Sequence, residues 1–202
     1  MNPPFFYDNI NKRLIDGLRE TIERGDRVSV AGSAFSVYAF EALRKELGGV
    51  GAFRFLYTSP AFSRIDTSGA KKASKEFFIP ERSREDALFG TPFEIRLRNR
   101  LMQQAAARAC AAWIRSSGTF KACRREGAMP GEILVGDGER AVQFFPVKDL
   151  TTTSLGTEKG EAYATQVLRL DAPVASEALK QFDAVWTDAS KTEDVTDRKS
   201  VV

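Results

Sequence analysis

Residues 28–57 read VSVAGSAFSVYAFEALRKELGGVGAFRFLY, which places a helix-like segment between two short apolar runs. The runs at residues 28–31 and 52–57 have the length and composition of buried strands. Ser36 is a suitable N-cap for the helix between them, and the glycine pair that begins at Gly48 ends it. The apolar face of that helix consists of Phe40, Leu43 and Leu47. A strand–helix–strand unit of this length predicts two parallel strands joined by a right-handed crossover.

Further elements on both sides of this unit complete the domain. The sequence predicts a first helix over residues 10–22, capped by Asp8 or Asn9, with Ile10 on its apolar face. The other expected elements are a long helix at 92–115, strands at 119–124, 132–135 and 141–145, and a closing helix at 176–186. The core side of the long helix is assigned to Leu97, Leu101, Ala105, Ala109, Ala112 and Trp113. The predicted fold class is α/β, with a mixed β-sheet flanked by helices.

The chain of 202 residues contains no histidine, and this absence excludes several kinds of active site. Imidazole is the commonest general base and the commonest metal ligand. A Ser-His-Asp triad, a His-based zinc site and a two-histidine phosphodiesterase site therefore cannot form within one chain. Acid–base chemistry by Asp, Glu, Lys or Tyr is still open.

Cysteine content and apolar runs indicate the compartment. The two cysteines, Cys110 and Cys123, form neither a disulfide framework nor a zinc site, so we expect reduced thiols, a cytoplasmic location and no metal. The N-terminus lacks a signal-peptide pattern, and no apolar run approaches the ~20 residues of a membrane span.

Charge is distributed unevenly along the chain. Residues 91–125 hold eight Lys and Arg against one Glu, whereas residues 156–197 hold four against nine Asp and Glu. Helical spacing places Arg96, Arg100 and Arg108 on one face of the long helix, where guanidinium groups can contact successive phosphates. Residues that extend this candidate patch are Lys121, Arg124 and Arg125. The alternative is an ordinary solvated charged face.

Gly32 and Ser33 follow the first predicted strand and precede a helix, a position where backbone amides can receive a phosphate. The sequence lacks the further glycines of a dinucleotide loop and has no Gly-Lys-Ser/Thr. A plain strand–helix turn is therefore the favoured interpretation, and no ATP site is visible in this chain.

Seven phrases of the sequence, taken in order, resemble one protein family. They are FSVYAFEAL (35–43), FRFLYTSP (53–60), FFIP (77–80), GTPFEIRLRN (90–99), ACAAWIR (109–115), LTTTSLG (150–156) and EDVTD (193–197). Together they resemble the N-terminal, phospholipase D-like domain of large bacterial superfamily-two helicases of the Snf type, which often occur near phage-defence genes. The resemblance implies a phospholipase D-like mixed β-sheet flanked by helices.

The resemblance also implies a longer parent protein. In that family an ATP-driven motor, which uses ATP and Mg, follows this domain in cis. We expect residues 1–188 to form the domain and residues 189–202 to be a truncated linker or tail, of which 198–202 look like non-native sequence. The alternative is a natural standalone protein with a polar terminus. No cofactor is expected for this fragment itself.

Active phospholipase D-like nucleases carry His-x-Lys on a strand and an Asn or Asp beyond it. By position in the resemblance, Pro130 and Glu132 stand where the His and Lys would be, and Asp149 stands where the Asn would be. Loss of the nucleophile and reversal of the neighbouring charge predict a degenerate site that does not cleave phosphodiesters.

The leading hypothesis is thus a catalytically silent accessory module that binds DNA phosphates or positions a helicase motor. The alternative is a protein-interaction module that meets the motor or a defence-system subunit without touching nucleic acid. A nuclease is the least favoured class.

Overall fold

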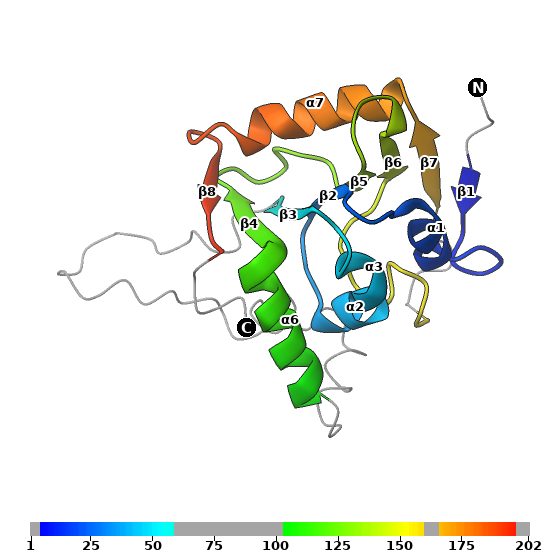
Figure 1. Ribbon diagram of the computed structural model, residues 1–202. Helices are drawn as coiled ribbons and strands as arrows, with labels where there is room; N and C mark the ends of the chain where they lie inside the picture. The colour runs from blue at the N-terminus through cyan, green and yellow to red at the C-terminus, as the bar shows by residue number, and fades with distance from the viewer. Residues whose placement is uncertain (1–4, 59–102, 160–165, 197–202) are drawn as a thin grey trace.

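The computed structural model describes residues 5–58, 103–159 and 166–196. Within these ranges, an eight-stranded sheet has the strand order β1-β7-β6-β5-β2-β3-β4-β8. The strands are β1 (Phe5–Tyr7), β2 (Arg27–Gly32), β3 (Ala52–Tyr57), β4 (Gly118–Cys123), β5 (Glu132–Val135), β6 (Val142–Phe145), β7 (Val167–Asp171) and β8 (Thr192–Asp194). The helices are α1 (Leu14–Thr21), α2 (Val37–Ala42), α3 (Arg44–Leu47), α6 (Gln103–Ser117) and α7 (Val174–Trp186). Figure 1 shows α7 along one side of the sheet and the other helices on the opposite side.

The centre of the sheet is the strand–helix–strand unit that the sequence predicts. Strand β2 pairs with β3 in parallel, with Val28 opposite Phe53 and Val30 opposite Phe55. Strand β3 continues in parallel to β4, and all the other pairings are antiparallel. The expectation of an α/β domain with a mixed sheet flanked by helices is therefore confirmed.

Phenylalanine side chains fill the core between the sheet and helices α1, α2, α3 and α6. The ring of Phe120, fully buried on β4, lies 5.2 Å from the ring of Phe35 and 5.7 Å from that of Phe55, centroid to centroid. Phe53 lies 6.0 Å from Phe120 and 4.8 Å from Trp113 on α6. Rings at these separations bury large apolar areas and add favourable aromatic contacts. This cluster joins the parallel strands β3 and β4 to α6 and to the turn before α2.

On the opposite face, α7 covers the sheet through Leu179, Phe182 and Trp186. A charged residue is packed into this layer. The guanidinium group of Arg54 donates to Ser29 Oγ at 2.7 and 3.0 Å and to Asp183 at 2.7 Å, and it lies 4.9 Å from the centroid of the Phe182 ring. Because its donors are paired and its plane contacts an aromatic ring, the sheet–helix interface accommodates this charge.

Helix α1 begins later than the sequence predicts. The predicted caps serve the turn before it: the Asp8 carboxylate accepts from the amides of Ile10 and Lys12, and Asn9 Oδ1 accepts from the amide of Leu14. The helix starts at Leu14 instead, and Ile10 is 71% exposed. Local side-chain hydrogen bonds compete with the helix at these positions, so the assignment of Ile10 to the apolar face was wrong.

In helix α6, the predicted core side is confirmed in part: Trp113 is buried and Ala109 packs against the core, but the rest of the buried face differs. Cys110, Trp113 and Ile114 are buried, whereas Ala105 and Ala112 are exposed. The Trp113 indole sets this rotation, because it donates to the Leu47 carbonyl at 3.0 Å and packs on two phenylalanine rings. Alanine fits either side of a helix, so an alanine stripe does not identify the buried face. Residues 92–102, which the sequence predicts as the first part of this helix, lie outside the described ranges.

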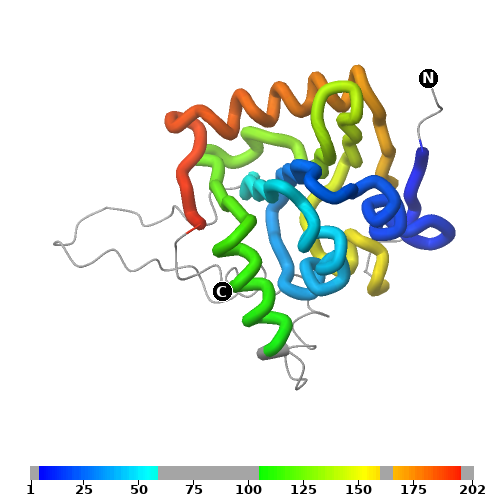
Figure 2. The backbone as a smooth tube through the Cα atoms, viewed as in Figure 1, coloured from blue at the N-terminus to red at the C-terminus, as the bar shows by residue number. Residues whose placement is uncertain are grey.

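Three short strands of the sheet were not predicted. Strands β1, β7 and β8 add to the sheet from segments distant in the sequence, as Figure 2 shows for β1 beside β7 and β8 beside β4. Strand β8 lies in residues 189–202, which the sequence suggests are a tail. Val195 is also buried, and its amide donates to the Phe120 carbonyl at 2.9 Å. The folded unit therefore continues to at least Thr196.

None of the helices in the described ranges is both long enough and apolar enough to cross a membrane.

Replacing Phe120 by alanine should lower the free energy of unfolding by about 3–5 kcal/mol, since it opens a cavity at the centre of the aromatic cluster. Urea denaturation measures this loss. The matched control is Phe5→Ala: Phe5 is 51% exposed, and the expected loss is below about 1 kcal/mol. Similar losses for the two variants would contradict the assignment of Phe120 to the core.

Candidate functional site

Two of the three positions that the sequence predicts as a degenerate site, Glu132 and Asp149, lie near the carboxyl end of β2. Glu132 pairs with Ala31 across the β2–β5 ladder. Asp149 lies beside the next residue of β2, because a Cβ atom added to Gly32 would be 3.3 Å from the Asp149 Cα. Pro130 is exposed just before β5. Glu132 and Asp149 thus lie near the same end of β2, without a contact between their side chains.

Glu132 points into the protein rather than toward a substrate. It is 2% exposed and accepts a hydrogen bond from Gln143 Nε2 at 2.5 Å. Burial raises the pKa of this carboxyl above its ordinary value, while the hydrogen bond from Gln143 opposes the shift. A buried carboxyl of this kind offers no positive charge to a phosphate.

Asp149 organises the loop that follows it. Its Oδ1 accepts from Thr151 Oγ1 at 2.7 Å and also from Ser154 Oγ. These local hydrogen bonds are typical of a carboxylate that stabilises a turn. The carboxylate is therefore occupied by its own loop.

The β2–α2 turn, where a phosphate loop was one hypothesis, uses amides within the fold. The amide of Ser33 donates to the Lys148 carbonyl at 2.9 Å, and that of Ser36 donates to the Leu150 carbonyl at 3.0 Å. The Ser36 hydroxyl accepts from the amide of Tyr38, so Ser36 is the N-cap of α2 as predicted. These contacts support the interpretation as a strand–helix turn.

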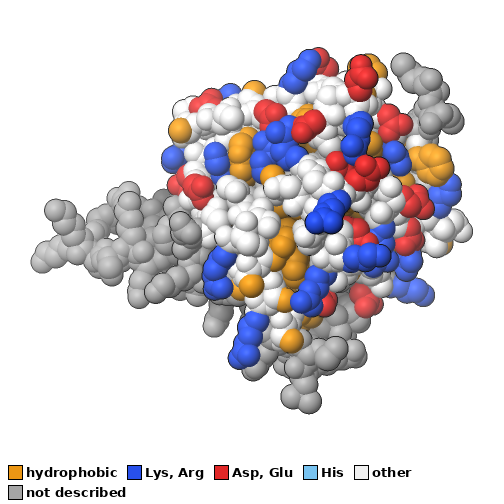
Figure 3. Space-filling view, in the orientation of Figure 1, with side chains coloured by type: hydrophobic (Ala, Val, Ile, Leu, Met, Phe, Trp, Pro, Cys, Tyr) orange, Lys and Arg blue, Asp and Glu red, His pale blue; other side chains and the backbone are white. Residues whose placement is uncertain are grey.

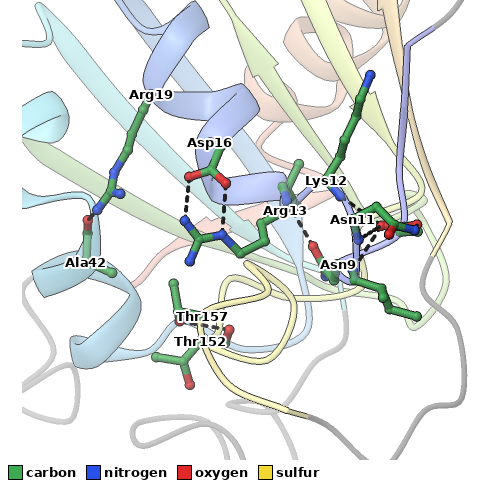
Figure 4. A network of polar contacts seen from close by, with 12 residues as sticks. Asn9, Asn11, Lys12, Arg13, Asp16, Arg19, Ala42, Thr152 and Thr157 are labelled. Atoms are coloured by element: carbon green, nitrogen blue, oxygen red, sulfur yellow. Dashed lines mark hydrogen bonds and ion pairs between the residues drawn. The ribbon is translucent and has the colours of Figure 1, made fainter.

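Polar contacts from the turn before α1, and others within the loop, hold the same loop. The amide group of Asn9 donates to the Ser154 carbonyl at 2.9 Å. Within the loop, Thr157 Oγ1 donates to the Thr152 carbonyl at 3.0 Å (Figure 4). Gly156 has φ +74°, and a Cβ atom there would collide with Asn9. Glycine is required here both by its backbone conformation and by this close approach.

The predicted phosphate-binding residues do not form one patch. Arg96 and Arg100 lie outside the described residues. Arg108 is exposed on α6 and has no ion-pair partner among the residues that the structure describes. Lys121 and Arg124 lie on and just after β4, and they have partners.

Lys121 lies on the α7 side of the sheet, whereas α6 packs on the other side. Its Nζ donates to the Trp186 carbonyl at 2.7 Å and lies 4.9 Å from the centroid of the Trp186 ring. A cation at this carbonyl stabilises the end of a helix. Lys121 thus secures the carboxyl end of α7 and does not join Arg108.

Arg124 binds the chain that leads into β8. Its Nε donates to the Ala189 carbonyl at 3.2 Å, and its Nη1 lies 3.7 Å from Glu193. Half of its side chain is exposed, so a phosphate contact would compete with these interactions.

Arg115 is a basic residue of the same surface that the sequence interpretation missed. It follows Arg108 by seven positions, so the two side chains leave α6 on one face, two turns apart. Both are exposed, and the exposed Ala105 and Ala112 lie on the same face. The seven-residue spacing could have identified Arg115 from the sequence.

Within the described ranges, the structure gives little support for a metal site or for a reactive cysteine. Within them, no three His, Cys, Asp or Glu side chains are grouped so that they could hold a metal ion. Both cysteines are free and buried, and burial raises the pKa of Cys110 to about 12. A thiol in that state is a poor nucleophile.

Comparison of the chain with protein-family models gives no match, and comparison with curated proteins also gives none. The mixed α/β architecture is shown by the structure, whereas kinship with phospholipase D-like domains stays a prediction from the sequence phrases.

Glu132→Gln should remove one component of the pH dependence of stability. Because the folded-state pKa of Glu132 exceeds its ordinary value of 4.5, the folded protein holds this proton to higher pH than the unfolded chain does. Wild-type stability should therefore fall, relative to the variant, as the pH rises from 4.5 through the folded-state pKa, and then level off.

Urea denaturation at a series of pH values measures this difference. The matched control is Glu139→Gln, which changes an exposed glutamate of the β5–β6 hairpin. Its stability curve should run parallel to that of the wild type. A parallel curve for Glu132→Gln as well would contradict the raised pKa.

Proposed function

We propose that this chain is a catalytically silent module that binds the phosphates of DNA through the exposed face of α6. The observation that carries the proposal is the pair Arg108 and Arg115, exposed two turns apart on one helix face. The 15 residues of α6 include no Asp or Glu, so nothing on the helix itself neutralises the pair. Guanidinium groups at this spacing suit a polyanion.

The absence of catalysis is supported by the chain's own residues. It contains no histidine to attack phosphorus. At the position where the resemblance expects a lysine, Glu132 is buried and hydrogen-bonded to Gln143. Asp149 is engaged by hydroxyl groups of its own loop. A scaffold that binds phosphate without breaking its ester bonds fits these observations.

In this proposal the module resembles the N-terminal, phospholipase D-like domain of Snf-type helicases and has a role beside a motor. Such a motor would act in cis and would supply ATP and Mg chemistry, for which this chain carries no Gly-Lys-Ser/Thr motif. The module would hold DNA while the motor moves, in a setting such as phage defence.

The double variant Arg108→Ala/Arg115→Ala should bind duplex DNA more weakly and with a smaller salt dependence. Each lost phosphate contact lowers the slope of log K against log salt by about 0.9, so the pair should lower it by about 1.8. Fluorescence anisotropy with a labelled duplex, titrated between about 50 and 200 mM salt, measures the slope.

The matched control is Arg108→Lys/Arg115→Lys, which keeps both charges and should retain the salt slope. A double alanine variant that binds with wild-type affinity and slope would remove α6 from the interface.

Incubation of the purified protein with single-stranded and duplex DNA should give no strand cleavage, with or without a divalent cation. Gel electrophoresis of end-labelled DNA measures this. Cleavage that disappears in an Asp149→Asn variant would show that the site is active after all.

One observation favours the alternative, a protein-interaction module. The edge strand β1 and its neighbour β7 expose a cross-strand pair, Phe6 at 41% and Leu168 at 37%. Exposed apolar residues on an edge strand are typical of sites that bind another protein. Failure of the wild-type protein to bind DNA even at low salt would favour this alternative.

A further inference from the structure

A surface cavity of about 770 Å³ lies between α1 and the corner formed by α2 and α3. The residues that line it are Arg19, Glu41, Ala42, Arg44, Lys45 and Glu46. Three of the six are cationic and two are anionic, so the cavity carries a small net positive charge. It has no part in the interface proposed above, which involves α6 alone.

The charged side chains that line this cavity differ in how strongly other residues of the protein hold them. Arg44 Nη1 lies 3.3 Å from Glu41, with both side chains well exposed. Arg19 donates to the Ala42 carbonyl at 2.8 Å, and its Nε lies 3.9 Å from Glu46. Exposed ion pairs are weak and exchange readily for other partners.

Lys45 is the most accessible cation of the cavity. It is exposed, and among the residues that the structure describes it has no ion-pair or hydrogen-bond partner. Lysine acts as a flexible point charge for phosphate.

The cavity and the basic face of α6 flank a rigid contact between α6 and the α2–α3 corner. Trp113 of α6 donates from its indole nitrogen to the Leu47 carbonyl of α3 at 3.0 Å and packs against Phe40 of α2, with ring centroids 4.8 Å apart. Lys45 and Arg115 are each two residues from this contact along their helices, so their exposed side chains project away from it toward solvent. Figure 3 shows Lys and Arg side chains over both α6 and the α2–α3 corner on one face of the molecule.

We infer that this cavity holds a further phosphate of the DNA backbone and that the path of the DNA crosses the α3–α6 seam from Arg115 to Lys45. The inference rests on the proposed function, since the same strand would contact α6. Lys45 contacts the phosphate directly, and Arg44 turns toward it when the strand displaces Glu41.

Two single substitutions in the full chain test this inference, and they should change the affinity for DNA in opposite directions. Lys45→Ala should lower the salt slope of duplex binding by about 0.9, the value for one phosphate contact. Glu41→Gln should instead strengthen binding severalfold at low salt, because it removes a negative charge from the cavity and frees Arg44. The matched control is Lys180→Ala, an exposed lysine of α7 on the opposite side of the sheet, which should leave the slope unchanged.

The outcomes separate this inference from the proposed function. If Lys45→Ala and Glu41→Gln both bind like the wild type while Arg108→Ala/Arg115→Ala weakens binding, the cavity is not part of the interface and α6 still is. If the wild type does not bind DNA at low salt, both the proposed function and the present inference are wrong. A loss for Lys45→Ala with a gain for Glu41→Gln supports the path across the seam.

Discussion

Packing of buried phenylalanines against Phe120 is the interaction on which the rest of this structure depends. Phe120 lies on β4, and its ring contacts those of Phe35, Phe53 and Phe55. Because these rings come from the neighbouring parallel strands β3 and β4 and from the turn before α2, their burial aligns β3 with β4 and holds this turn against them. It also provides the surface on which Trp113 packs, and Trp113 in turn determines which face of α6 meets solvent. The exposure of Arg108 and Arg115 follows from this packing.

The two faces of the sheet are stabilised by different interactions. The α6 side is apolar, so hydrophobic burial stabilises it directly. The α7 side contains Arg54 and Lys121, whose charges would be costly without partners. Ser29, Asp183 and the aromatic rings of α7 surround Arg54, while Lys121 neutralises the carboxyl end of α7. Among the basic residues that the structure describes, Arg54 and Lys121 serve the fold, whereas those on the surface with weak partners or none are accessible to a polyanionic ligand.

The two carboxylates that the resemblance places at a reacting site have structural roles in this fold. Glu132 and Asp149 both lie near the carboxyl end of β2, at positions where the resemblance expects reacting groups. One carboxyl is now buried against Gln143, and the other stabilises a loop. Both interactions are stabilising ones that a substrate phosphate would have to break. Contact surfaces elsewhere on the domain, α6 and the neighbouring cavity, therefore carry the proposed function.

Local pattern alone determined the central elements, because a buried strand or a capped helix leaves its periodicity in a few consecutive residues. The parallel pair β2–β3, the cap at Ser36, the β5–β6 hairpin strands and the lack of an attacking histidine are all visible in the sequence. Tertiary structure decided the rest. The edge strands β1 and β8 are three residues each and exist only through distant partners. The buried side of α6 depends on one indole contact, because alanine has no preference of its own. The separate roles of Lys121 and Arg108 arise from strand alternation in a sheet whose two faces meet different helices, a relation that no local stretch of sequence encodes.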